Sequence, residues 1–158
     1  DFGELGIHHV VVLAGARLRA GTGIATLLAG GKPHALGGNF FEPTLVGGVT
    51  AEMAVAREET FGPLAPLFRF RDEAEVIRQA NDTEFGLASG ICTTSLKYAS
   101  HYKRNSEAGM VMVNLPTAGV DYHVPFGGRK GSSYGAREQG SYAREFYTTV
   151  KTAYTFPG

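Results

Sequence analysis

Between residues 63 and 114 the chain alternates short apolar runs with polar segments of helical period, and this alternation restricts the fold more than any other feature. The runs PLAPLFRF, GLASGICTT and GMVMVN have the length and composition of strands. Between them lie DEAEVIRQAND, which has an acidic first turn, and SLKYASHYKRNSEAG, which opens with a capping serine. Strands separated by helices of about 10 residues are typical of βαβ units. The sequence therefore predicts an α/β fold with a largely parallel sheet and flanking helices.

The segments on either side are less regular. Further strand candidates are Val10 to Ala14, TLLAGG and FFEPTLV. After Asn114 a stretch rich in Gly, Pro and Ser runs to about Gly140, and ordered loops of this length are often functional. A short helix is expected within AREQGSYAREFY. The final FYTTVKTAYTF alternates β-branched and aromatic residues, and it predicts a strand that needs a partner edge.

Charge balance and cysteine content limit the possible functions. Lys plus Arg and Asp plus Glu each number 15 in 158 residues, so no net field attracts nucleic acid or an anionic membrane. We find no apolar run that could span a bilayer and no secretory leader, and we expect a cytoplasmic protein. The single cysteine, Cys92, excludes a disulfide framework and a multi-cysteine zinc site. His8 and His9 are adjacent and would face opposite sides of a strand, so we predict no metal site.

Four motifs occur in a specific order along the chain: REETFGPLAPLFRF, NDTEFGLASGICT, AGMVMVN and VPFGGRKGSSYG. In this order and spacing the chain resembles the C-terminal half of the aldehyde dehydrogenase superfamily, from about Leu27 to its end. The resemblance implies that residues 24–146 form part of the catalytic domain. It also implies that residues 147–158 form a strand that joins subunits into a homo-oligomer, and it leaves residues 1–23 unmatched.

The resemblance implies a chemistry as well. Residues 38–70 are similar to succinate-semialdehyde dehydrogenases, and residues 120–140 look like enzymes that oxidise α-ketoglutarate semialdehyde, which implies a short aldehyde carrying a carboxylate. In this family a cysteine thiolate attacks the aldehyde, hydride passes to NAD or NADP, and a glutamate assists hydrolysis of the thioester. In complete members the nucleophile and that base lie upstream of the matched region. We therefore assign no catalytic residue here and expect the chain to be inactive alone.

Several residues match positions to which the family gives a role. Glu59 matches the glutamate that accepts hydrogen bonds from the nicotinamide ribose, and a carboxylate suits two vicinal hydroxyls. Phe61 matches the aromatic residue beside the nicotinamide, and Phe126 matches a wall of the substrate tunnel. Arg129, followed by Lys130, could bind a substrate carboxylate through its planar fork. The alternatives are a solvated turn for Glu59, core positions for the two phenylalanines, and a solvated surface pair for the two cations.

Cys92 and Asn114 are expected to have structural roles. Cys92 lies in an apolar strand, whereas a reactive thiol needs exposure and a nearby positive charge or helix N-terminus. Asn114 ends GMVMVN, where its side chain can order the following loop through hydrogen bonds.

Two other classes of function stay open. One is a non-catalytic binding or structural module that kept the fold and lost the chemistry. The other is a weak esterase-type hydrolase that uses Cys92, or Ser132 or Ser133 with His123 and Asp121, although no nucleophile-elbow pattern supports it.

Overall fold

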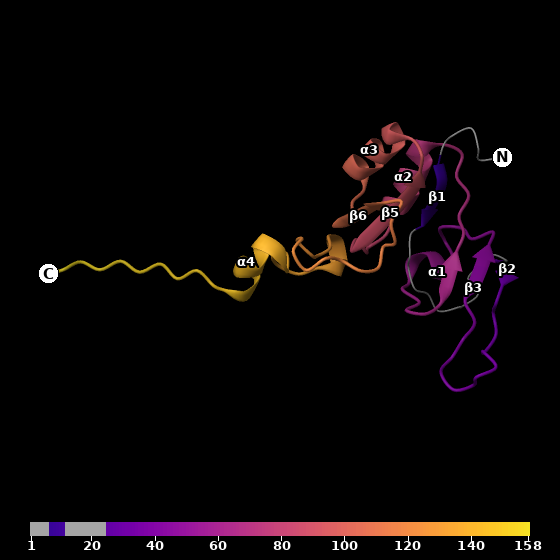
Figure 1. Ribbon diagram of the computed structural model, residues 1–158, viewed down its shortest axis with the longest axis horizontal. Helices are drawn as coiled ribbons and strands as arrows, with labels where there is room; N and C mark the ends of the chain where they lie inside the picture. Colours follow the sequence, from indigo (N-terminus) through magenta and orange to yellow (C-terminus); the bar gives the residue numbers. More distant parts are fainter. Residues whose placement is uncertain (1–6, 12–24) are drawn as a thin grey trace.

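The structure is a computed structural model that describes residues 7–11 and 25–158, and its strands form two small sheets (Figure 1). The first sheet contains β1 (Ile7–Val11), β5 (Ala88–Thr93) and β6 (Met110–Val113). Its central strand β5 runs antiparallel to β1 and parallel to β6. The strand predicted at residues 10–14 is thus found at 7–11, and residues 12–24 lie outside the described residues, as do the side chains of His8 and His9.

The second sheet contains β2 (Thr26–Ala29), β3 (Thr44–Gly47) and β4 (Leu64–Pro66). Its central strand β3 runs antiparallel to β2 and parallel to β4. The α/β class is confirmed, but the prediction of one largely parallel sheet is wrong, because each sheet is mixed. The connection from β2 to β3 carries no crossover helix, so the chain returns antiparallel. Antiparallel edge strands of this kind are common in mixed sheets.

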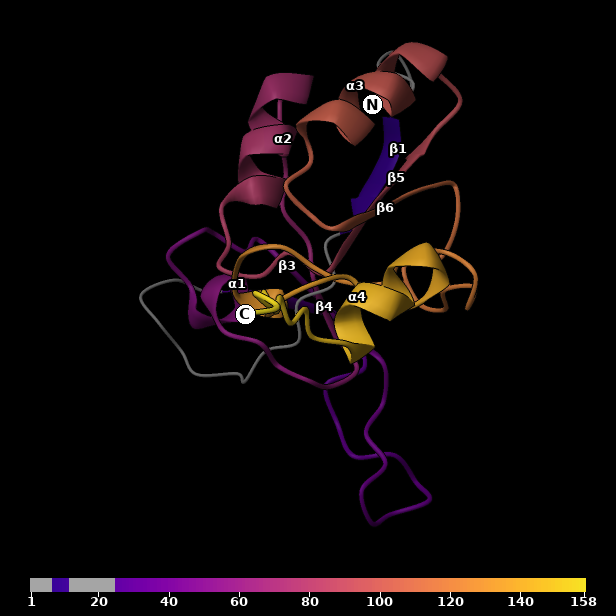
Figure 2. The ribbon, with the colours of Figure 1, turned by 90° about the vertical axis from the view of Figure 1, so that its left-hand side faces the viewer.

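The two predicted helices are confirmed as α2 (Glu73–Asn81) and α3 (Leu96–Asn105). The Asp72 carboxylate accepts a hydrogen bond from the Glu75 N–H at 2.8 Å and caps α2. The Ser95 hydroxyl caps α3 in the same way, accepting from Tyr98 N–H at 3.4 Å. The helices lie side by side, and α3 also packs against β5 (Figure 2).

Each sheet has its own buried residues. Beside the first sheet, Tyr102 of α3 is only 1% exposed and Ile91 of β5 is 3% exposed. The second sheet packs on a cluster made of Val46, Val49, Met53 and Val55, of which the last lies in α1 (Ala54–Arg57). This one-turn helix was not predicted, because four residues are too few to display a helical period.

The chain beyond β6 is mostly irregular. It contains the 3-10 helices η2 (Lys130–Ser132) and η3 (Gly140–Tyr142), and then α4 (Ala143–Tyr147), which agrees with the short helix predicted there. Residues 148–158 are exposed and extend away from the sheets (Figure 1). They form no strand in the single chain, so the terminal oligomerisation strand stays a prediction.

Within residues 7–11 and 25–158, no helix has the length and apolar character needed to cross a membrane. The same part of the chain holds no cluster of three His, Cys, Asp or Glu side chains suited to a metal ion.

Candidate functional site

Glu59 and Phe61 lie in the irregular segment that joins α1 to β4. Glu59 is exposed, and Phe61 is 91% exposed with a backbone φ of 47°. A bulky residue rarely adopts a positive φ, and an exposed phenylalanine forgoes roughly 1.5–3 kcal/mol of burial free energy. The predicted alternative in which Phe61 belongs to a core is therefore wrong for this chain. Both side chains are accessible to whatever binds at this segment.

Phe126 begins a loop that closes on itself. Its N–H donates to the Glu138 carbonyl at 2.7 Å, and the Glu138 N–H donates back at 2.8 Å. Inside this closed loop the Gly128 N–H donates to the Ser133 hydroxyl at 2.7 Å. Phe126 itself is half-buried. The two backbone hydrogen bonds thus fix Phe126 at the point where the loop closes.

The same loop is fastened to the turn before β5. The Arg129 N–H donates to the Gly86 carbonyl at 2.9 Å, and the Gly86 N–H donates to the Ser132 hydroxyl at 2.9 Å. The Arg129 side chain remains exposed. Because Ser132 and Ser133 both accept backbone hydrogen bonds that shape this loop, their hydroxyls serve its structure, and this disfavours the hydrolase hypothesis.

The Asn114 side chain both accepts a hydrogen bond from and donates one to the Thr93 backbone, as a residue of a neighbouring strand would. The Thr93 N–H donates to Asn114 Oδ1 at 2.8 Å, and Asn114 Nδ2 donates to the Thr93 carbonyl at 2.9 Å. The backbone φ of 56° turns the chain away from β6 here, a conformation that asparagine tolerates better than most residues. The side-chain hydrogen bonds predicted for Asn114 are present and reach Thr93 at the end of β5, while its ordering of the following loop stays a prediction.

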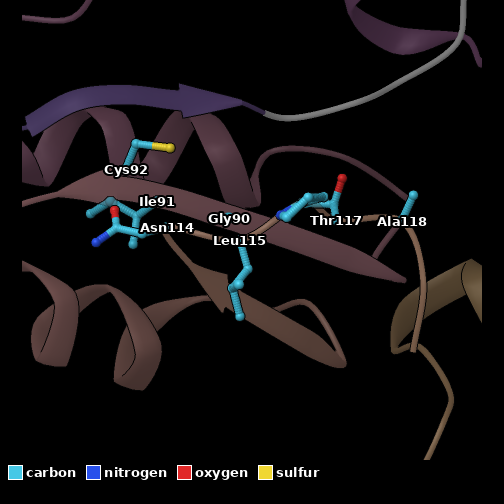
Figure 3. A pocket seen from close by; sticks show the side chains of 8 residues that line it. Gly90, Ile91, Cys92, Asn114, Leu115, Thr117 and Ala118 are labelled. Carbon is cyan, nitrogen blue, oxygen red and sulfur yellow. The ribbon is translucent and has the colours of Figure 1, made fainter. Parts of the chain in front are cut away.

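A pocket of about 440 Å³ lies beside Asn114, lined by Gly90, Ile91 and Cys92 of β5 and by residues 114–118 (Figure 3). In Figure 3 the Cys92 side chain points away from that of Leu115. Cys92 is half-buried, and the described residues that line the pocket include no Lys, Arg or His. The surroundings of Cys92 are consistent with its predicted structural role.

The sequence did not reveal what holds Lys130. Its ammonium group contacts the carbonyls of Asn81 and Thr83 and the carboxylate of Glu107, and its side chain is 25% exposed. Lys130 is therefore engaged within the protein through its ammonium group, although both residues of the predicted pair count as exposed. No local pattern identifies such partners, because the two carbonyls lie 49 and 47 residues from Lys130 in the sequence.

Comparison with known proteins assigns the family. A sequence model of the aldehyde dehydrogenase family matches residues 16–153. The chain is 50% identical over 127 residues to the glutarate-semialdehyde dehydrogenase of Pseudomonas aeruginosa, and 49% identical over 127 residues to the NADP-dependent succinate-semialdehyde dehydrogenase of Escherichia coli. Each match covers 80% of this chain and 26% of the relative.

A crystal structure of succinate-semialdehyde dehydrogenase from Burkholderia pseudomallei superposes with a TM-score of 0.72 at 48% identity. That match covers 78% of this chain and 25% of the other. The chain thus spans about a quarter of the length of the relatives it matches. Together the sequence model, the identities and the superposition show that this chain belongs to the aldehyde dehydrogenase family.

Proposed function

We propose that this chain supplies the C-terminal part of the active site of an NAD(P)-dependent aldehyde dehydrogenase. The observation that carries the proposal is the exposed segment with Glu59 and Phe61, in which a phenylalanine is held outside the core in a strained backbone conformation. Strain and apolar exposure of this kind tend to occur where a ligand or another part of the protein completes a site. A solvated turn alone gives no reason for either feature.

The chemistry of this segment fits a nicotinamide cofactor. Glu59 offers two carboxylate oxygens to the vicinal hydroxyls of a ribose, and both oxygens act only as acceptors when ionised. Phe61 offers a flat apolar face that would limit where the ring can lie. When bound, NAD or NADP accepts the hydride that leaves the aldehyde carbon. The part of this chain is to bind and orient the cofactor, while the nucleophile comes from a segment that it does not contain.

The proposed substrate is a short aldehyde that carries a carboxylate. Relatives named as glutarate-, succinate- and α-ketoglutaric semialdehyde dehydrogenases support this class. Within the chain, Phe126 would form part of an apolar wall, and Arg129 would offer its guanidinium to the carboxylate. The hydrogen bond from the Arg129 N–H to the Gly86 carbonyl fixes the backbone of Arg129, so the base of its side chain would have a defined position.

We also propose that residues 147–158 pair with a neighbouring copy of the chain to form a homo-oligomer. Val150, Tyr154 and Phe156 are each at least 90% exposed, and β-branched and aromatic residues are common in strands. An apolar extended segment of this kind gains hydrogen bonds and burial only by joining a sheet edge. The oligomer would be closed and symmetric, as most homo-oligomers are.

The experiment that tests the missing nucleophile is NAD(P)H formation by the chain alone. Succinate semialdehyde and α-ketoglutarate semialdehyde would be supplied with NAD or NADP at two protein concentrations. We expect no turnover, because the resemblance to the family implies that the cysteine nucleophile lies upstream of the matched region. Turnover that rises in proportion to the chain and disappears in Cys92→Ala would contradict the proposal and make Cys92 the nucleophile.

A further inference from the structure

The turn at the C-terminal end of α2, residues 81–84, receives a side chain from Arg57, the last residue of α1 before the segment that carries Glu59. Arg57 Nη2 donates to the Asp82 carboxylate at 2.9 Å, and Arg57 Nη1 donates to the Asp82 carbonyl at 3.1 Å. Its Nε donates to the Ala51 carbonyl at 2.6 Å. The hydrogen bond from Arg57 lowers the pKa of Asp82 below its ordinary value, so the carboxylate is ionised at neutral pH. One planar guanidinium thus fixes the start of the cofactor segment, two residues before Glu59.

The same turn also receives a side chain from the Phe126 loop. Lys130 Nζ donates to the Asn81 carbonyl at 2.5 Å and to the Thr83 carbonyl at 3.2 Å, and it pairs with Glu107 at 2.5 Å. These carbonyls lie at the C-terminal end of α2, where the helix dipole favours a cation. Lys130 itself has a φ of 52°, a backbone strain that the surrounding contacts must offset.

The 81–84 turn is itself held firmly. Asn81 Nδ2 donates to the Asn105 carbonyl at 2.8 Å, and the Glu107 N–H donates to Asn81 Oδ1 at 2.9 Å. These bonds join the end of α2 to the end of α3. The turn can therefore serve as a fixed reference for the segments that bind to it.

We propose that Arg57 and Lys130 are positioning residues that set the cofactor segment, residues 58–61, and the substrate loop, residues 126–129, at a defined separation by binding both to the 81–84 turn. The inference rests on the proposed function, in which the cofactor segment and the substrate loop form two parts of one site. An active site needs its groups within a fraction of an ångström of their productive positions. Exposed ion pairs contribute little to the free energy of folding, so we expect these contacts to act by fixing the positions of the two segments.

The test is a distance measurement between spin labels on the intact chain. The labels would be attached to Glu58→Cys and Arg129→Cys in a Cys92→Ser background, because Glu58 and Arg129 are exposed and lie in the two segments. We expect Arg57→Gln and Lys130→Met each to widen the distance distribution by up to roughly twofold, because each removes a side-chain contact with the 81–84 turn, while the backbone hydrogen bonds from the loop to Glu84 and Gly86 remain. The matched control is Arg71→Gln, which removes an exposed arginine–carboxylate pair of the same kind, with Glu75, that does not involve the 81–84 turn.

A second variant guards against loss of folding. The charge exchange Arg57→Asp with Asp82→Arg should restore the narrow distribution that Arg57→Asp alone loses. The proposal is overturned if Arg57→Gln and Lys130→Met leave the distribution as narrow as Arg71→Gln does, if all three broaden it equally, or if the exchange restores nothing. The measurement uses no cofactor, so its failure leaves the role of Glu59 to be decided separately.

Discussion

Replacing Asn114 with alanine is expected to lower the free energy of unfolding by about 2–5 kcal/mol. Two side-chain hydrogen bonds to Thr93 are lost, at about 0.5–1.5 kcal/mol each. In addition, alanine must adopt the left-handed conformation that Asn114 occupies at φ 56°, which costs roughly 1–2 kcal/mol. Urea unfolding followed by circular dichroism would measure the change, provided that the slope of the transition is the same for both proteins.

Asn114→Gly separates the two contributions, because glycine enters the left-handed region freely but makes no side-chain bonds. We expect Asn114→Gly to lie between the native chain and Asn114→Ala. Equal stability of Asn114→Ala and the native chain would show that the Asn114–Thr93 contacts do not contribute to holding the loop after β6.

Replacing Gly109 with alanine is expected to destabilise the chain by about 2–3 kcal/mol through overpacking. Gly109 precedes β6, and a Cβ there would overlap the Gly127 carbonyl oxygen, with Arg137 Nη1 at 2.6 Å and Gly128 Cα at 2.7 Å. Two of these three neighbours are backbone atoms, so a simple change of rotamer cannot relieve the clash. The Phe126 loop must move away instead.

Gly62→Ala is the matched control, because its Cβ would meet only the Thr60 side chain and carbonyl, both at 3.7 Å. We expect it to change the free energy of unfolding by less than about 1 kcal/mol. The same urea titration applied to both variants gives the comparison. If Gly109→Ala proves as stable as Gly62→Ala, the loop does not lie against Gly109 as described.

The helices could be predicted from sequence because their signals are local. Asp72 and Ser95 cap α2 and α3 within three residues of the N–H groups that they accept from, and such short-range patterns are visible in the sequence. Strand direction was predicted poorly, because 76 residues (12–87) separate β1 from β5 and nothing local encodes that pairing. The length of β4 was overestimated, since only three residues of PLAPLFRF pair with β3.

The candidate site likewise has features that could be predicted from the sequence and features that could not. That Asn114 would form side-chain hydrogen bonds could be predicted because the asparagine stands at a strand end, but its partner Thr93, 21 residues away, could not be named from the sequence. The binding of Lys130 to the 81–84 turn could not, because it depends on how two distant segments meet. The exposure of Phe61 was also hidden, since an aromatic residue next to an apolar run is usually buried.

The most direct test of the proposed function places this chain in a complete enzyme. In a chimera, the chain replaces the 26% of the Pseudomonas aeruginosa glutarate-semialdehyde dehydrogenase that it matches, so the relative supplies the upstream segments. NAD(P)H formation is then compared for the chimera, for Glu59→Gln and for Glu58→Gln, an exposed neighbour of the same charge. We expect turnover by the chimera, a KM for NAD(P) about 10- to 100-fold higher in Glu59→Gln, and no change in Glu58→Gln, because a hydrogen bond to a charged acceptor contributes about 1.5–3 kcal/mol. Equal KM values for Glu59→Gln and the chimera, or a folded chimera without turnover, would contradict the assignment of this chain to the cofactor site.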